Sequence, residues 1–488
     1  MTFRTWDAHT DRLAGAVASL GVAAGDRVVL LLAGGEPMAS LHLALQKLGA
    51  ISVPLSTRFG PNELAYCVED CGPRLVVTDA EHAQKATAAL AGHDLPRAHL
   101  GEPNDAPQGA AALASLAERA DPLTVPAPVE DAVSVMLYTS GTTGRPKGVP
   151  RTHRAEHAAA TAHVIQTQQR PDEVVLGVMP MFHTMGLRTL LASIIVGGTW
   201  VPLARFDPDA ALELIVADRV SSLYLVPTMF WSLLQSGRLD EATSLRRLAY
   251  AGAAMTPALA ERLAAAVEPE LLVNHFGSTE IYTFTISPDG LTKPGCAGRA
   301  GVFSRIRLVA PETGAAPDEL VGPGEQGQVI ASLASPEAFA GYWNRPDADA
   351  KAIRDGWYYT GDLATTDDDG DLWVSGRVDD MINSGGENIY PDEIEAALAR
   401  CPAIADVVVA GLPDERWGQA VTAFAVPGDG LEADAALDEL TAFARERLPG
   451  FKRPKRYVAV REVPKSAVGK ILRRELREGG FEALAERP

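Results

Sequence analysis

The chain has 488 residues, more than one compact core holds, so two or more domains are expected. Its composition, 47% hydrophobic and 22% charged, is that of an ordinary globular protein. The net charge of −19 argues against nucleic acid as a partner, because phosphate binding needs a basic surface.

The N-terminus has no basic region followed by an apolar run, so no signal peptide is expected. Apolar stretches such as 28–33 and 194–201 are far shorter than the roughly 20 residues that cross a bilayer. The four cysteines have no neighbouring His or second Cys pair at the spacing that metal ligands show. Reduced thiols in a cytoplasmic protein without a membrane span are therefore predicted. Cys67 and Cys71, about one helical turn apart, stay open as an oxidisable pair.

Helical periodicity and short β-branched runs alternate along the first two thirds of the chain. Helices are expected at 13–22, 38–50, 62–72, 211–219 and 257–267. Strands are expected at 26–33, 51–56, 74–80, 174–180, 198–203, 221–227 and 245–252. This alternation, with short Gly/Pro/Asp connections, predicts βαβ units on parallel sheets. Residues from about 102 to 130, rich in Pro, Ala and Asp, are expected to form a surface connection.

The pattern changes after about residue 290. Short strands at 305–311, 327–333 and 371–377 favour a small antiparallel sheet or barrel. From Tyr390, helices at 392–400 and 436–448 and strands at 406–412, 421–427 and 456–460 suffice for a small α+β domain. The expected architecture is α/β: a large N-terminal domain, 1–378, of stacked βα sheets with a small barrel-like subdomain, and a small α+β C-terminal domain, 379–488.

The strongest local motif is YTSGTTGRPKGV, Tyr138–Val149, directly after the apolar run AVSVML. Glycines let the backbone approach a ligand, Ser/Thr hydroxyls and N–H groups donate hydrogen bonds, and Lys147 supplies charge. The segment lacks the Gly-Lys-Ser/Thr ending of a Walker loop, which argues against the P-loop NTPases. The motif therefore predicts a loop that wraps phosphates, with a flexible Gly/Ser/Thr hairpin as the alternative.

Residues 451–474 hold nine Lys or Arg and one Glu on an otherwise acidic chain. Such a local basic patch favours a polyanionic ligand, such as a nucleotide or coenzyme A. A solvated basic face is the alternative.

The glycine-rich motif resembles the signature of the adenylate-forming superfamily, which holds acyl-CoA synthetases, firefly-type luciferases and peptide-synthetase adenylation domains. Further motifs of that superfamily follow in order: MPMFHTMG from Met179, FGSTE from Phe276, YYTGDL from Tyr358, SGRVDDMINSGGENIYPDEIE from Ser375 and PKSAVGKILRREL from Pro464. The similarity covers almost the whole chain. The strings GRVDDMI, SGGENI, DERWGQ and FKRPKRY are especially similar to bacterial 4-chlorobenzoate-CoA ligases and related aryl-CoA ligases.

This resemblance implies an ATP site. Glu280 and Thr143 are expected to hold Mg²⁺, since hard oxygen ligands suit that ion. Thr279 is expected to bind the α-phosphate, and Asp362 with Arg377 the ribose. The remaining nucleotide contacts are expected from the phosphate loop and from two segments around adenine: Thr139, Ser140, Gly141, Thr142, Thr143, Lys147, Ala251, Gly252, Ala253, Asn274, His275, Phe276 and Gly277. Phe276 stands where the superfamily usually has tyrosine.

The resemblance also implies that the C-terminal domain is mobile and rotates at Asp379 between two half-reactions. Lys470 is expected to bridge the substrate carboxylate and the α-phosphate, where a cation offsets the charge that develops as pyrophosphate leaves. Gly386, with its neighbours, is expected to face the pantetheine of coenzyme A. The contacts to the coenzyme A nucleotide are expected at Trp417, Phe451, Arg453 and Lys455. A core aromatic is the alternative for Trp417.

His183 is expected at the acyl pocket. It is also a catalytic candidate, together with Lys470, Glu280 and Thr279. The rest of the pocket is expected at Ala162, Thr184, Met185, Tyr224, Ala251, His275, Gly277, Tyr282 and Thr283. This mostly apolar set suits a neutral ring or alicycle. No Asp occupies the place in MPMFHTMG that binds an amino-acid amine, which argues against a peptide synthetase. Ala162 replaces a phenylalanine of the chlorobenzoate-type enzymes, so acids larger than benzoate stay open.

The predicted function is an ATP-dependent acyl- or aryl-CoA ligase that uses ATP, Mg²⁺ and coenzyme A. The acid first gives acyl-AMP and pyrophosphate, and the acyl group then passes to coenzyme A with release of AMP. Two alternatives remain: a ligase that stops at acyl-AMP or loads a carrier-protein thiol, and a nucleotide-binding regulatory protein. The intact Glu280, Asp362 and Lys470 argue against the second. A carrier protein and a homodimer stay open as partners.

Overall fold

The computed structural model describes residues 1–488 apart from 94, 124–127, 140–144, 312–313, 385–386, 451 and 466–470. The side chains of 103, 379, 383, 387 and 388 also lie outside the description. The chain forms two compact units. Unit 1 comprises Met1–Ile306 and Ala331–Tyr358, and unit 2 comprises Arg307–Ile330 and Tyr359–Pro488. The predicted division at residue 379 stays a prediction.

The first sheet of unit 1 has the strand order β5-β4-β3-β1-β2-β6-β7. Its strands pair in parallel up to β6, and β7 closes the edge antiparallel to β6. The strands are β1 (Arg27–Leu31), β2 (Ile51–Pro54), β3 (Leu75–Thr78), β4 (Arg97–His99), β5 (Ala111–Ala112), β6 (Val133–Thr139) and β7 (Lys147–Thr152). Strands β2 and β3 are buried along their whole length, as parallel strands covered on both faces require.

The second sheet of unit 1 has the order β14-β13-β12-β11-β10-β8-β9. Strands β8 to β12 are parallel, and β13 and β14 are antiparallel additions. The strands are β8 (Val174–Gly177), β9 (Thr199–Pro202), β10 (Ser222–Leu225), β11 (Arg247–Ala251), β12 (Leu271–Phe276), β13 (Thr285–Ser287) and β14 (Arg299–Ala300).

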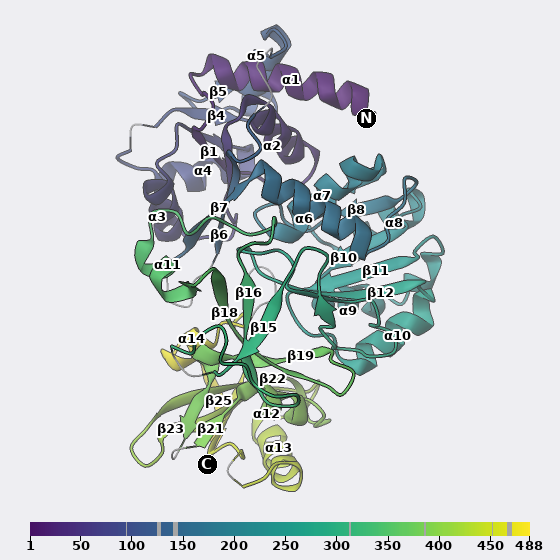
Figure 1. Ribbon diagram of the computed structural model, residues 1–488, viewed down its shortest axis with the longest axis vertical. Helices are drawn as coiled ribbons and strands as arrows, with labels where there is room; N and C mark the ends of the chain where they lie inside the picture. Colours follow the sequence, from purple (N-terminus) through teal and green to yellow (C-terminus); the bar gives the residue numbers. More distant parts are fainter. Residues whose placement is uncertain are drawn as a thin grey trace. The chain divides into compact units, whose positions relative to one another are not determined.

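The helices of unit 1 cover these sheets, with α6 and α7 between them (Figure 1). The sequence sets the start of helix α10. The Thr256 side chain accepts a hydrogen bond from the Leu259 N–H, and Pro257 fits the first turn. The helices are α1 (Phe3–Ser19), α2 (Glu36–Leu48), α3 (Pro61–Cys71), α4 (Ala80–Ala89), α5 (Leu113–Arg119), α6 (His153–Gln166), α7 (Thr184–Val196), α8 (Pro208–Ala217), α9 (Pro227–Gln235), α10 (Pro257–Val267) and α11 (Pro346–Ala352), with 3₁₀ turns at Pro103–Asp105 and Leu239–Glu241.

A small sheet has the order β15-β16-β18-β17, with β19 beside β18. It matches the antiparallel sheet expected after residue 290. Its strands are β15 (Ile306–Val309), β16 (Gly327–Ser332), β17 (Ile353–Arg354), β18 (Trp357–Thr366) and β19 (Leu372–Arg377), and a 3₁₀ turn, η3 (Val378–Asp380), follows.

The rest of unit 2 is an α+β layer in which α12 and α13 pack through one apolar cluster onto a sheet. The sheet order is β21-β20-β23-β24-β25, with β22 beside β23. The elements are β20 (Ile382–Ser384), β21 (Glu387–Ile389), α12 (Pro391–Leu398), β22 (Ile404–Asp414), β23 (Gly418–Pro427), α13 (Ala433–Arg447), β24 (Arg456–Val460), α14 (Arg473–Arg477) and β25 (Ala483–Arg487).

Two local expectations differ from the structure. The expected connection at 102–130 holds β5 and the helix α5, because Leu113, Leu116 and Ala117 form an apolar face that packs into the core of unit 1. Helix α1 begins ten residues before the expected start, at Phe3, because Thr2 and Thr5 form a capping box.

All four cysteines are free and buried. Burial raises the pKa of the Cys67 and Cys71 thiols well above their ordinary value, which keeps both protonated. Among the described residues, no helix is long and apolar enough to cross a membrane.

Candidate active site

The two ends of the glycine-rich loop are held together by the hairpin of β6 and β7. Thr139, the last residue of β6, pairs with Lys147, the first residue of β7. The intervening Ser140, Gly141, Thr142 and Thr143 lie outside the described residues. The structure therefore brings Thr139 and Lys147 together at the mouth of this loop.

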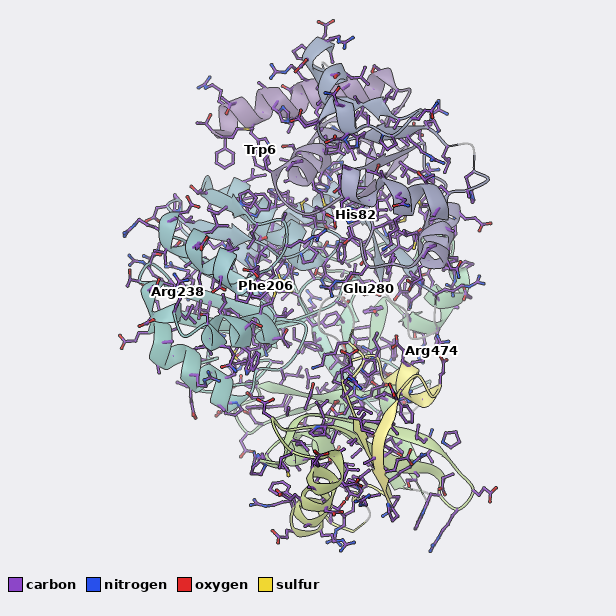
Figure 2. All side chains as sticks on the ribbon, turned by 180° about the vertical axis from the view of Figure 1, so that it is seen from behind. Trp6, His82, Phe206, Arg238, Glu280 and Arg474 are labelled. Carbon is purple, nitrogen blue, oxygen red and sulfur yellow. The ribbon has the colours of Figure 1, made fainter. Side chains whose placement is uncertain are left out.

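Glu280 is linked to Lys147 through one tyrosine that the sequence analysis missed. The Tyr342 hydroxyl donates to Glu280 Oε1 at 2.6 Å, and the Lys147 Nζ lies 4.2 Å from the centre of the Tyr342 ring. Glu280, labelled in Figure 2, is 6% exposed. Burial and the Glu280 carboxylate raise the pKa of Tyr342, so its hydroxyl stays a donor near neutral pH. A cation and a carboxylate thus both contact Tyr342.

The backbone at Thr279 and Glu280 is held by a second missed residue, Arg151 on β7. Its side chain is fully buried, and Nη1 donates to the carbonyl oxygens of Thr279 at 3.1 Å and Glu280 at 3.3 Å. The same nitrogen donates to the Glu337 carbonyl at 2.9 Å, and Nε pairs with the Glu156 carboxylate at 2.5 Å. Because Arg151 joins the hairpin strand to the FGSTE segment, Thr279 and Glu280 keep a fixed position relative to Lys147.

The residues expected around adenine lie at the carboxyl ends of two neighbouring parallel strands. Ala251 ends β11 beside His275 of β12, and Gly252 follows with a φ of +85°, which an L side chain rarely adopts. Ala253 is exposed next to Gly252. Parallel sheets bind ligands at this edge, so the positions fit a nucleotide site.

The segment after β12 is closely packed. A Cβ on Gly277 would collide with the Tyr282 carbonyl oxygen, so this backbone position requires glycine. Phe276 packs edge-to-face on Phe284, with ring centres 5.2 Å apart. The Asn274 amide donates to the Cys296 carbonyl at 2.8 Å, so this side-chain nitrogen is engaged within the protein. The roles of these residues toward adenine stay predictions.

Residues that are expected to line the acyl pocket lie on α6, α7, β10, β11 and β12. The rings of His163, Tyr224 and His275 form one cluster, with centres 4.8 Å (His163–Tyr224), 5.3 Å (His163–His275) and 5.4 Å (Tyr224–His275) apart. Ala162, which is predicted to line the acyl pocket, is fully buried, and its neighbour His163 was not predicted. The pocket role of Ala162 stays a prediction.

Tyr282 and Thr283 are buried, as are Thr184 and Met185 at the start of α7. The Tyr282 hydroxyl donates to Glu156 at 3.3 Å, so this hydroxyl is engaged within the protein. His183 stands at the N-cap of α7, where its N–H donates to the Pro180 carbonyl at 3.0 Å.

The pocket residues include a charged group that the sequence analysis missed. Arg188 lies on α7, four residues after Thr184 and three after Met185, and is 2% exposed. Its Nη1 donates to the Tyr224 hydroxyl at 3.4 Å, and its guanidinium carbon lies 4.9 Å from the centre of the Tyr282 ring. Arg188 would therefore add a buried charge to the expected pocket, which the sequence predicts to be mostly apolar. The helical spacing from Thr184 was the signal that would have found Arg188.

In unit 2, the two residues expected at the ribose are cross-strand partners. Asp362 on β18 pairs with Arg377 on β19, and Arg377 Nη1 donates to Asp362 Oδ1 at 2.7 Å. The Asp362 N–H donates to the Thr360 hydroxyl at 2.9 Å. The structure thus brings this carboxylate and this guanidinium together.

The residues expected at the coenzyme A nucleotide also lie in unit 2. The Lys455 Nζ is 5.4 Å and the Arg416 guanidinium carbon 4.8 Å from the centre of the Trp417 ring. Burial and Arg453 lower the pKa of Lys455. Arg453 donates to the carbonyls of Leu448 and Arg445, both at 2.8 Å. Phe451, Gly386 and Lys470 lie outside the described residues, as does the side chain of Asp379.

The described residues fit the expected magnesium ion. One oxygen of Glu280 accepts from Tyr342, and the other has no hydrogen bond from a described residue. A carboxylate oxygen of this kind is a ligand that Mg²⁺ prefers. Thr143, the second expected ligand, lies outside the described residues.

Comparison with known proteins identifies the family. The model of the "AMP-binding enzyme" family matches residues 1–343, and that of the "AMP-binding enzyme C-terminal domain" matches residues 393–470. The chain therefore belongs to the AMP-binding enzyme family.

The relatives include CoA ligases. The chain is 36% identical to the feruloyl-CoA synthase of Amycolatopsis sp, over 98% of this chain and 93% of that protein. It is 33% identical to the 4-chlorobenzoate–CoA ligase of Arthrobacter sp, over 95% of this chain and 87% of that protein. The crystal structure of ATP-bound MatB from Rhodopseudomonas palustris matches with a TM-score of 0.87 and 30% identity, over 97% of this chain and 92% of that one. These matches confirm the predicted family and the α/β fold class.

Proposed function

We propose that the protein activates a ring-containing carboxylic acid with ATP and passes it to coenzyme A. First, a carboxylate oxygen attacks the α-phosphorus of ATP, the bond to the bridging oxygen breaks, and pyrophosphate leaves. The coenzyme A sulfur then attacks the acyl carbonyl, its proton passes to solvent, and AMP leaves. The enzyme class, an AMP-forming acid–thiol ligase that uses ATP and coenzyme A, follows from family membership. The ring acid and the residue roles are the proposal.

The linked group of Lys147, Tyr342 and Glu280 carries this proposal. A polyphosphate needs positive charge and a metal-binding carboxylate at fixed positions, because phosphoryl chemistry depends on positioning and charge neutralisation. Lys147 supplies the first and Glu280 the second, and Tyr342 connects them by a 2.6 Å hydrogen bond and a 4.2 Å cation–ring contact. Magnesium at Glu280 would neutralise charge on the departing pyrophosphate.

The residues of unit 2 take the other roles in the proposal. Asp362 and Arg377, joined at 2.7 Å, would bind the ribose hydroxyls. Lys470 would bridge the carboxylate and the α-phosphate. Rotation at Asp379 would then bring Trp417 and Lys455 to the coenzyme A nucleotide, where an aromatic face suits adenine and an ammonium group suits phosphate. A cytoplasmic location fits the use of ATP and coenzyme A.

The test measures both half-reactions in parallel on a panel of aromatic and alicyclic acids, as pyrophosphate release and as acyl-CoA mass. We expect both signals for at least one ring acid. Pyrophosphate release without acyl-CoA would indicate a ligase that stops at acyl-AMP or loads a carrier protein. Absence of pyrophosphate release with every acid would refute the proposal.

A matched pair of variants tests the site itself. Glu280→Gln removes the metal-binding charge and should abolish pyrophosphate release. Glu241→Gln changes an exposed carboxylate on the surface turn at Leu239–Glu241 and should leave the rate unchanged. Equal rates for the two variants would show that Glu280 does not act at the phosphates.

A further inference from the structure

Arg188 differs from the other buried arginines of the described chain in lacking an ionic partner. Arg151 contacts the Glu156 carboxylate and several carbonyl oxygens. Arg247 contacts the carboxylates of Glu173 at 3.2 Å and Glu270 at 3.3 Å. Among the described residues, no carboxylate oxygen lies within 4 Å of Arg188.

The hydrogen-bonding capacity of Arg188 is also largely unused. A guanidinium has five N–H donors in a planar fork. The Tyr224 hydroxyl accepts one of them at 3.4 Å, and Nε has no partner among the described residues although it is fully buried. Burying a cation without a charged partner is strongly unfavourable. The protein therefore carries a planar donor group inside the expected acyl pocket that its own described side chains do not satisfy.

The three ring side chains that cluster beside Arg188 are uncharged near neutral pH. Burial, followed by the nearby Arg188 guanidinium, holds the pKa of His163 and of His275 well below the ordinary value, so both imidazoles are neutral. Burial raises the pKa of Tyr224. The rings of these three residues form the cluster that contacts Arg188 through Tyr224. In such surroundings an anion on the ligand is the natural partner of the guanidinium.

Glu337 is a buried carboxylate that interacts electrostatically with Arg188 without forming an ion pair with it. Its side chain is fully buried, and burial raises its pKa even though Arg188 and Arg151 act to lower it. Burial thus favours the neutral form of Glu337, which opposes its action as a counter-ion of Arg188. The alternative role for Arg188, as a counter-ion of Glu337, is therefore included in the test.

We propose that Arg188 binds a second carboxylate of the acid that is activated, so that the substrate is a dicarboxylic ring acid. This inference rests on the proposed function and names its substrate class. A planar carboxylate matches the guanidinium fork, and two parallel N–H···O bonds give both energy and orientation. Arg188 is then a specificity-determining residue of α7, one helical turn from Thr184 and Met185.

The test compares each benzenedicarboxylate isomer with its monomethyl ester, which keeps one carboxylate and nearly the same shape. Acid-dependent exchange of pyrophosphate with ATP gives kcat/KM, and calorimetry gives the affinity of the protein for each acid alone. We expect at least one diacid to exceed its monoester by about 100-fold in kcat/KM, because an ester cannot reproduce a buried charged contact. We expect calorimetry to give the same order of preference.

Three variants separate the roles. Arg188→Met should lower the ratio of diacid to monoester at least tenfold, and Arg188→Lys, which keeps the charge and loses the fork, should give an intermediate ratio. Glu337→Gln should keep the preference for the diacid. If Arg188 only balances Glu337, then Arg188→Met reduces exchange with both acids alike and leaves their ratio unchanged, which would overturn the inference.

Failure of the inference is distinguishable from failure of the proposed function. Exchange with monoacids or monoesters but not with diacids would overturn the role of Arg188 and leave the ligase activity standing. No exchange with any acid of either kind would overturn both.

Discussion

Replacing Tyr342 by phenylalanine isolates the hydrogen bond that fixes Glu280. The variant removes one hydroxyl and the 2.6 Å bond to Glu280 Oε1. The ring itself is expected to stay, because it packs edge-to-face on Phe339 with centres 5.0 Å apart and lies under the Lys147 ammonium group. Glu280 then keeps its charge and loses the donor that orients it.

The size of the effect follows from the kind of bond. A hydrogen bond to a charged group contributes about 1.5–3 kcal/mol. If that energy positions Glu280 for the metal and the phosphates, its loss slows adenylation by about 10- to 150-fold, since about 1.4 kcal/mol corresponds to a tenfold change in rate. The Mg²⁺ concentration that gives half-maximal rate should rise as well.

The assay is pyrophosphate exchange at several Mg²⁺ concentrations, together with the conversion of supplied acyl-AMP to acyl-CoA. Tyr358→Phe is the matched control, because the Tyr358 hydroxyl lies 3.5 Å from that of Tyr342 and no described bond joins it to Glu280. We expect Tyr342→Phe to slow only the first half-reaction. Equal slowing of both half-reactions, or an effect no larger than that of Tyr358→Phe, would refute the reasoning.

Three further predictions concern unit 2. Lys470→Ala should abolish adenylation and spare thioester formation from supplied acyl-AMP, and equal loss of both would contradict the assignment. Asp379→Pro, which fixes φ near −65° and removes a backbone donor, should spare pyrophosphate exchange and cripple acyl-CoA formation; parental turnover of acyl-AMP with coenzyme A would argue against a hinge there. Arg473→Met should lower the free energy of unfolding by about 3–5 kcal/mol at pH 8, because Arg473 pairs with the carboxylates of Asp392 at 2.6 Å and Glu395 at 2.7 Å. The loss should be smaller at pH 5, because burial raises the pKa of Asp392 and that of Glu395 to about 7, so both are protonated more often there. Denaturant titration measures this against Arg474→Met, whose parent side chain is 50% exposed, and a pH-independent difference would count against it.

The repeating elements were predictable because their signals are local. The parallel strands β1, β2 and β3 are short apolar runs. Helix α10 has a Thr cap and a first-turn proline, which favour a helix start whatever the rest of the chain does. Helix α5 was missed because its flanks are rich in turn-forming residues. The apolar face of α5 stabilises the helix only by packing against the core of unit 1.

The motifs by themselves identified the chemistry, since a glycine-rich loop, FGSTE and TGDL in order define the family wherever they occur. The sequence predicted that Asp362 and Arg377 serve one site, and adjacent strands make them neighbours. A motif states which residue types a reaction needs. It carries no information about the groups that hold them.

Only the tertiary structure supplied those supporting groups. Tyr342 follows Glu280 by 62 residues and Arg151 precedes Thr279 by 128, so no local pattern connects them. Arg188, Tyr224 and His275 come from one helix and two strands and meet only when the second sheet packs against α6 and α7. Periodicity records which side of an element is apolar, whereas the partner of a buried charge depends on which elements pack together. The sequence therefore predicted the reaction. It did not identify the acid that is activated, because that depends on which side chains the packed elements bring together.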